Sequence, residues 1–183
     1  MKIAVISDIH GNHERQLLGV WDGEAGAIDP LSSDGYAATK IGAAHARWMR
    51  AIPAFHWLMP DVLLVHGTPG SDLQYWMETV TADFGQHGSR AMRCGGTLVV
   101  NPGSVGLQAY EDGHPHKHCV ENGSPHARYA IVERRPLGWH VQQHAVPYDW
   151  EAQARVAAEH ARPDWAHALR TGRMAPAHAT IAQ

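Results

Sequence analysis

The first fourteen residues constrain the fold and the chemistry of this chain more than any other segment. Residues Lys2 to Ser7 are β-prone and mostly apolar, which predicts a strand buried in a sheet. Asp8 and His10 follow at once, and Gly11-Asn12-His13-Glu14 comes directly after them. Side chains at the carboxyl end of such a strand project into the crevice where open α/β sheets bind ligands. Carboxylate, imidazole and amide groups so close together predict a metal site, although Asp, Gly and Asn are also ordinary turn residues.

A second segment repeats this arrangement of a strand followed by a ligand. Residues Asp61 to Val65 have the composition of a buried strand, and His66 lies just past its end. His66-Gly67-Thr68-Pro69 is by itself compatible with a simple turn. Because Asp8 and His10 follow another apolar strand, we favour a metal ligand at His66. We expect Asp8, His10 and His66 to converge at the carboxyl ends of neighbouring strands.

Size and composition indicate a globular protein. The chain has 183 residues, 44% of them hydrophobic and 18% charged, which suits one domain over residues 1–171 with a frayed tail over residues 172–183. A formal net charge of −3 leaves no electrostatic footprint for nucleic acid. No signal peptide or membrane-length apolar segment is visible, and two cysteines do not make a disulfide framework. We therefore expect a cytoplasmic protein with no membrane partner; its oligomeric state stays open.

Hydrophobic periodicity predicts both helices and strands along the rest of the chain. We expect helices over Gly35 to Ile52, Ser71 to Thr81, Glu151 to His160 and Asp164 to Arg170, a strand over Thr97 to Val100, and a hairpin that pairs Arg128 to Arg134 with Trp139 to Val146. The fold class is therefore α/β.

Several of these motifs together resemble the calcineurin-like metallophosphoesterase family, and more narrowly its small bacterial phosphodiesterase-like branch. The resemblance extends over most of the chain, and the matching segments are Asp8-x-His10, Gly11-Asn12-His13-Glu14, Val65-His66-Gly67-Thr68-Pro69, Asn101-Pro102-Gly103-Ser104, Gly123 to Ala130 and Val146 to Trp150. It implies a shortened αββα sandwich of the metallophosphoesterase type.

The resemblance also implies a role for each residue of the motifs. Asp8 and His10 would hold a first divalent metal ion, and Asn12 and His66 a second one. His13 would act as the general acid on the leaving group, with Glu14 or another carboxylate to orient it. The implied activity is hydrolysis of a small phosphate ester, a monoester or a diester, by a metal-activated water. Mn, Fe, Ni and Zn are all candidate ions.

Two departures from the family pattern bear on this activity. The family separates Asp-x-His from Gly-Asn-His by a segment with a Gly-Asp word, whose Asp bridges both metals, but this chain contains no Gly-Asp dipeptide. We also interpret the late Gly-His-x-His word of the family as missing, because this chain has Gly85-Gln86-His87-Gly88-Ser89-Arg90 in its expected place before the strand Thr97 to Asn101. A catalytically impaired protein of this fold, acting as a metal- or partner-binding module, is therefore the alternative.

Other polar residues are weaker candidates. Arg90 and Arg93 could steer a phosphate, but a solvated surface role is favoured for both. Histidines 114, 116 and 118 would share one side of the chain only in an extended segment, and Asp112-Gly113 before them indicates a loop with a surface role. A histidine-rich metal-binding module is the function that this cluster alone would support. Asn101 to Ser104 is interpreted as the floor of the site or as a tight turn, and His126 as a residue that orders a loop.

Overall fold

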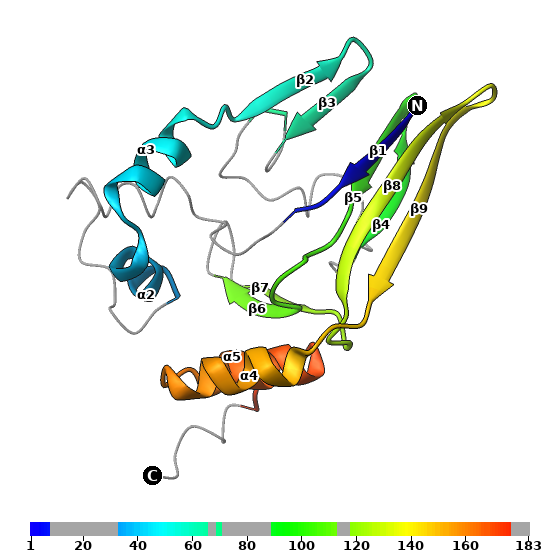
Figure 1. Cartoon of the computed structure of the whole chain (residues 1–183). Helices are drawn as coiled ribbons and strands as arrows, with labels where there is room; N and C mark the ends of the chain where they lie inside the picture. The colour runs from blue at the N-terminus through cyan, green and yellow to red at the C-terminus, as the bar shows by residue number, and fades with distance from the viewer. Residues whose placement is uncertain (8–32, 66–68, 71–88, 113–117, 177–183) are drawn as a thin grey trace. The chain divides into compact units, whose positions relative to one another are not determined.

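The structure is a computed structural model, and it describes residues 1–7, 33–65, 69–70, 89–112 and 118–176. The chain forms two compact units: Met1–His10 together with Met77–Gln183, and Gly11–Trp76 (Figure 1). Both helices and strands are present, as the α/β prediction requires. None of the helices in the described ranges combines the length and the apolar character that crossing a lipid bilayer demands.

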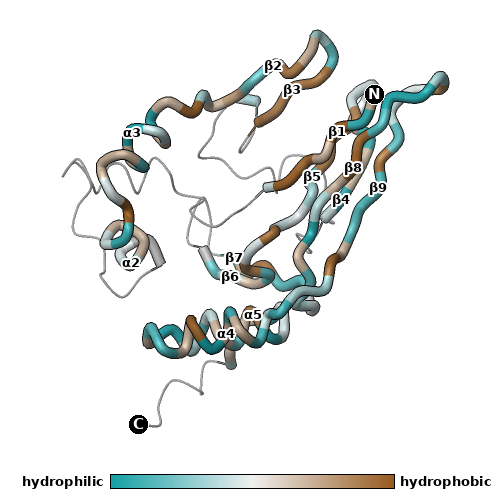
Figure 2. Tube along the Cα trace, in the orientation of Figure 1, coloured by the Kyte–Doolittle hydropathy of each residue, from teal (hydrophilic) through white to brown (hydrophobic). Residues whose placement is uncertain are grey.

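A three-stranded antiparallel sheet forms the centre of the first unit. Its order is β1 (Lys2–Val5), β8 (Ala127–Arg135), β9 (Gly138–Val146). The predicted hairpin is confirmed, and its two strands pair in one continuous register from Ala127↔Val146 to Arg135↔Gly138. A strand from Lys2 is also confirmed, and it runs antiparallel to β8 from Lys2↔Glu133 to Val5↔Ala130. It was predicted to be buried, but its side chains are exposed or only partly buried, because β1 is an edge strand of the sheet. Figure 2 shows the hydrophobic character of β1.

Two further hairpins belong to this unit. β4 (Arg90–Cys94) pairs with β5 (Thr97–Asn101), and β6 (Ala109–Asp112) pairs with β7 (His118–Glu121). Of these strands only β5 was predicted. The turn of the first hairpin is Gly95-Gly96, with Gly95 at φ +58, and a Gly-Gly pair between two strands is a sequence signal for such a turn. That signal would have revealed β4.

Two helices follow β9, as predicted. α4 (Trp150–Glu159) begins after Asp149, whose Oδ1 accepts a hydrogen bond from the Ala152 N–H at 2.9 Å. α5 (Pro163–Thr171) has its proline in the first turn, where no N–H is needed, and ends at Gly172 in the left-handed conformation. The buried core beside α5 consists of Leu107, Ala109 and Ala168, with Tyr110, Trp165, Leu169 and Met174 packed against it.

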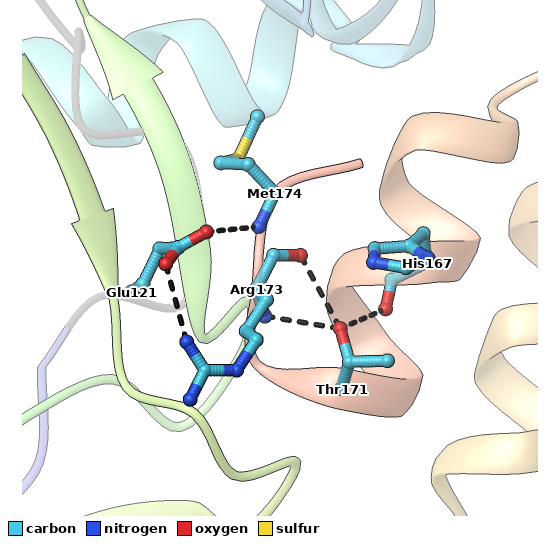
Figure 3. Close-up of polar contacts among 5 residues, drawn as sticks. All are labelled: Glu121, His167, Thr171, Arg173 and Met174. Carbon is cyan, nitrogen blue, oxygen red and sulfur yellow. Dashed lines mark hydrogen bonds and ion pairs between the residues drawn. The ribbon is translucent and has the colours of Figure 1, made fainter. Parts of the chain in front are cut away.

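The residues that follow α5 are held by β7. The Met174 N–H donates a hydrogen bond to Glu121 Oε1 at 2.8 Å, and Arg173 Nη1 lies 3.5 Å from Glu121 Oε2 (Figure 3). Thr171 Oγ1 donates to the His167 carbonyl at 2.8 Å and accepts from the Arg173 N–H at 3.0 Å. The first residues after α5 are therefore anchored; residues 177–183 of the predicted tail lie outside the described residues.

The second unit contains α2 (Ser33–Lys40), α3 (Ala43–Ala51), β2 (Phe55–Met59) and β3 (Val62–Val65). A single helix was predicted from Gly35 to Ile52; instead two helices form, and Gly42 caps the second with an extended backbone at φ −88° and ψ 164°. Glycine has a low helix propensity, which favours the break at this position. The strand predicted to end at Val65 is confirmed, but its residues are exposed or only partly buried. It pairs antiparallel with β2, which was not predicted, and among the described residues it does not neighbour β1 as expected.

Candidate active site

Ser7 joins the end of β1 to the turn that follows β5. Its hydroxyl donates a hydrogen bond to the Gly103 carbonyl at 3.0 Å, and its own carbonyl accepts one from the Val105 N–H at 3.2 Å. Ser7 and Ser104 form a parallel bridge. Because Asp8 comes next in the chain, the start of the ligand-rich segment is attached at this turn.

The Asn101–Ser104 turn is stabilised by its own polar side chains. Asn101 Oδ1 accepts a hydrogen bond from the Gly103 N–H at 2.9 Å, and Ser104 Oγ accepts one from the Gly106 N–H at 3.0 Å. Pro102, Gly103 and Ser104 are buried. Residues 102–104 thus form a buried turn in contact with Ser7, as the interpretation of a tight turn predicts.

Gly103 is required in this turn for two reasons. Its φ of +82° is a conformation that residues with a side chain rarely adopt. A β-carbon at this position would lie 2.9 Å from both Arg128 Cβ and Ser89 Cβ. The missing side chain therefore lets β8 and the residue just before β4 approach the turn closely.

The buried side chain of Gln108 stabilises the same turn. Its side chain is 1% exposed, and its Nε2 donates to the Ser104 carbonyl at 2.8 Å and to the Gly106 carbonyl at 3.0 Å. Its Oε1 accepts a hydrogen bond from Asn122 Nδ2 at 3.0 Å, so the buried amide is satisfied at both ends. Gln108 was not singled out in the sequence, where a lone glutamine beside Leu107 and Ala109 gives no signal of this role.

The predicted metal ligands and the predicted acid lie outside the described residues. Asp8, His10, Asn12 and His13 fall in residues 8–32, and His66 falls in residues 66–68. Within the described ranges, no group of three or more His, Cys, Asp or Glu side chains could hold a metal ion. The assignment of metal ligands therefore rests on the sequence motifs and on the anchoring of Ser7.

The two arginines proposed to steer phosphate lie on β4. Arg90 is the first residue of β4 and is partly buried. It pairs with Asn101, so it lies beside the Asn101–Ser104 turn. Arg93 pairs with Leu98 near the other end of the hairpin and is exposed. The exposure of Arg93 is what the favoured surface interpretation predicts.

The histidine cluster lies between β6 and β7. His118 begins β7, and its ring packs edge-on against Tyr110 with 6.1 Å between ring centroids. Histidines 114 and 116 fall in residues 113–117, outside the described residues. The loop that Asp112-Gly113 indicated is therefore a connection within a hairpin.

This connection also holds a motif that the interpretation of the sequence overlooked. Gly113-His114-Pro115-His116 matches the pattern Gly-His-x-His, so the word is present in the chain. It stands after the Asn101–Ser104 turn, whereas the family carries it before the corresponding strand. For the Gly-His-x-His word, the departure from the family pattern is therefore one of position in the sequence, whereas the Gly-Asp word is missing altogether. His114 and His116 are two further imidazoles with the spacing of this word.

His126 orders the loop before β8, in line with its predicted role. Its Nδ1 lies 2.6 Å from Ser124 Oγ, and its ring lies 5.4 Å from the ring of Trp150. The loop closes on the end of α5, because the Gly123 N–H donates to the Gly172 carbonyl at 2.8 Å. These contacts hold the start of β8, where Arg128 lies.

Comparison with known proteins shows a similarity to solved structures. No protein-family model and no curated protein matches this sequence. Among solved structures, the chain is similar to a metallophosphoesterase from Sphaerobacter thermophilus, with a TM-score of 0.60 and 19% identity over 88% of this chain and 75% of that one. This chain has a metallophosphoesterase-like fold. At this level of identity, the similarity concerns the fold alone.

Proposed function

We propose that this chain is a metal-dependent phosphoesterase, which hydrolyses a small phosphate monoester or diester within a shortened αββα sandwich. The hydrogen bond from Ser7 to Gly103 carries the proposal, because it attaches the start of the Asp8-x-His10 segment to the Asn101–Ser104 turn. Ser7 lies far from this turn in the sequence but contacts it in the structure, and the fold is similar to that of a solved metallophosphoesterase. A phosphodiesterase that uses manganese in the cytoplasm is the finer form of the proposal.

Each residue of the ligand-rich segment has a proposed role. Asp8 and His10 would hold one divalent ion and Asn12 and His66 a second, since carboxylate, amide and imidazole suit Mn, Fe, Ni or Zn. When bound, such ions supply an activated water and neutralise charge on the phosphoryl oxygens. His13 would protonate the leaving oxygen, a task that suits a side chain with a pKa near neutrality.

The number of ligands sets the expected strength of this activity. The assignment gives two protein ligands for each ion and no bridging carboxylate, because no Gly-Asp word exists in the sequence. His87 and histidines 114, 116 and 118 are the imidazoles that we propose could complete the coordination. Without such completion we expect at most one firmly held ion, weak hydrolysis and only partial rescue by saturating manganese.

The test is hydrolysis of a chromogenic phosphodiester and of the matching monoester by the full chain, together with its metal content. We expect hydrolysis that disappears with a chelator and returns with manganese. Asp8→Asn should remove most metal binding and hydrolysis, because the carboxylate sets the affinity for the ion. Glu159→Gln, at an exposed carboxylate on α4, is the matched control and should change neither quantity. Hydrolysis that persists in Asp8→Asn would contradict the proposal.

The alternative function is a catalytically impaired protein of the same fold that serves as a metal- or partner-binding module. The absence of a Gly-Asp word from the sequence favours it. The same experiment separates the two functions. Bound metal that depends on Asp8, without hydrolysis of either ester, would identify the binding module.

A further inference from the structure

Arg128 lies against the turn that holds Ser7. It is the second residue of β8, and its backbone N–H donates a hydrogen bond to the Ser104 carbonyl at 2.8 Å. The same turn also contacts Ser7, because the next residue, Val105, donates its N–H to the Ser7 carbonyl. Arg128 is therefore positioned beside the point where the ligand-rich segment starts.

The side chains of Arg128 and Ser89 both lie against Gly103. Measured from the place where a β-carbon of Gly103 would stand, Arg128 Cβ is 2.9 Å away, Arg128 Cδ is 3.2 Å away and Ser89 Cβ is 2.9 Å away. Two donor side chains from distant segments thus meet at one glycine. Arg128 belongs to the Gly123 to Ala130 motif and Ser89 to the Gly85 to Arg90 segment, but the sequence predicted no role for either residue.

Each of these two side chains carries a buried polar atom that has no hydrogen-bond partner among the described residues. Arg128 Nε and Ser89 Oγ are shielded from solvent, and neither makes a hydrogen bond within the described part of the chain. A guanidinium is charged at every physiological pH, and an enclosed donor without an acceptor is costly. Four other arginines contact carboxylates, at 2.8, 2.7, 3.0 and 3.5 Å: Arg135, Arg162, Arg170 and Arg173.

We infer that Arg128 and Ser89 bind an anionic oxygen of a phosphate group. The inference rests on the proposed function, because this group would be the phosphoryl group of the ester. Guanidinium groups pair with phosphate oxygens through charge-assisted hydrogen bonds, and the serine hydroxyl adds a second donor. Because Gly103 has no side chain, both donor side chains can lie against this turn.

The test is titration of the metal-free full chain with inorganic phosphate, followed by steady-state hydrolysis of a chromogenic phosphodiester. Hydrogen bonds to charged groups contribute about 1.5–3 kcal/mol, so we expect Arg128→Gln to weaken phosphate binding at least about tenfold. Ser89→Ala should weaken it less, and Arg128→Lys should restore part of the loss through its charge. In hydrolysis, the same variants should raise KM more than they lower kcat. Arg155→Gln, at an exposed arginine on α4, is the matched control.

The two proposals fail separately. Equal phosphate affinity in Arg128→Gln and Arg155→Gln, or no phosphate binding by the unaltered chain, would overturn the anion site while leaving any metal-dependent hydrolysis intact. Phosphate binding that requires Arg128, in a chain that hydrolyses neither ester, would keep the anion site and overturn the phosphoesterase. If Arg128→Gln does not fold, Ser89→Ala and Arg128→Lys decide by the same comparison.

Discussion

The Ser7 hydroxyl donates a hydrogen bond to the Gly103 carbonyl across 96 residues of sequence, at a distance of 3.0 Å. This bond joins the strand end that precedes Asp8 to a buried turn. This hydrogen bond is partly buried, so water would not fully satisfy the Gly103 carbonyl if the Ser7 hydroxyl were removed. The turn and the ligand-rich segment should consequently respond together to changes at either residue.

Removing this bond should weaken both stability and metal binding. We expect Ser7→Ala to lower the free energy of unfolding by about 1 kcal/mol, the usual contribution of one such hydrogen bond, and to weaken manganese binding. Denaturant unfolding and metal titration provide the measurements. Thr39→Ala removes a hydroxyl that donates to the Tyr36 carbonyl at 2.7 Å within an exposed helix, and it should leave metal binding unchanged. Equal effects of both variants on metal affinity would refute the link.

A β-carbon at Gly103 should destabilise the protein by strain and by overlap. Gly95→Ala is the matched control, because Gly95 also has a positive φ, of +58°, but no described atom lies within 4 Å of the place where its β-carbon would stand. We expect strain of about 1–2 kcal/mol in both variants. The contacts with Arg128 and Ser89 should add about 1–3 kcal/mol in Gly103→Ala alone. Chemical denaturation measures the difference, and similar values for the two variants would contradict this account.

Gln108→Glu should make stability depend on pH. The substitution keeps the shape of the side chain but replaces the Nε2 donors, which face the carbonyls of Ser104 and Gly106, by an oxygen. Burial and the two carbonyls should raise the pKa of the new carboxyl in the folded state above its unfolded value. Stability should therefore be retained at low pH and lost as the pH rises through the folded pKa, by about 2–4 kcal/mol near neutrality.

Unfolding curves from about pH 4 to pH 8 test this direction. The unaltered protein provides the reference at each pH. A penalty that does not change with pH would show that lost packing, and not the new charge, is responsible.

His13→Ala should separate catalysis from metal binding. A general acid acts in the transition state, so its loss should lower kcat and leave the metal content near that of the unaltered chain. Metal analysis and steady-state hydrolysis give the two quantities. A loss of metal as large as that in Asp8→Asn would show that His13 is a ligand.

Asp164 should stabilise α5 when its side chain is ionised, and not at acidic pH, where the carboxylate is protonated. Burial opposes its ionisation, but hydrogen bonds from Arg162 and from the Trp165 N–H outweigh this and lower its pKa below the ordinary value of 3.8. Arg162 contacts both carboxylate oxygens, at 3.1 and 2.7 Å. Because the folded pKa is lowered, the stabilisation is present above the unfolded pKa and is lost as the pH falls through the folded pKa.

We therefore expect Asp164→Asn to cost less than about 1 kcal/mol near neutrality, since the side chain is about half exposed, and nothing at a pH below both pKa values. Thermal unfolding at several pH values measures this. Glu159→Gln on α4 is the control. A constant difference between Asp164→Asn and the unaltered chain at every pH would contradict the role of the charge.

Elements with a strong local pattern were predicted well. The strands of the β8–β9 hairpin are nine residues long and alternate in part between apolar and polar residues, and α5 has a proline at its start and a glycine just past its end. β2, β4, β6 and β7 were missed, because strands of four or five residues carry little periodicity. The break between α2 and α3 was missed because a single glycine is tolerated within many helices.

The sequence by itself determined the strand at Lys2, the β8–β9 hairpin, the last two helices and the dense set of metal-type side chains from Asp8 to Glu14. These follow from the order of neighbouring residues, which local propensity and spacing express. Only the tertiary structure decided that Ser7 meets Gly103, that Gln108 holds the turn, and that Arg128 and Ser89 meet at one glycine. These contacts depend on how distant segments pack, and no local pattern encodes which buried donor finds which carbonyl.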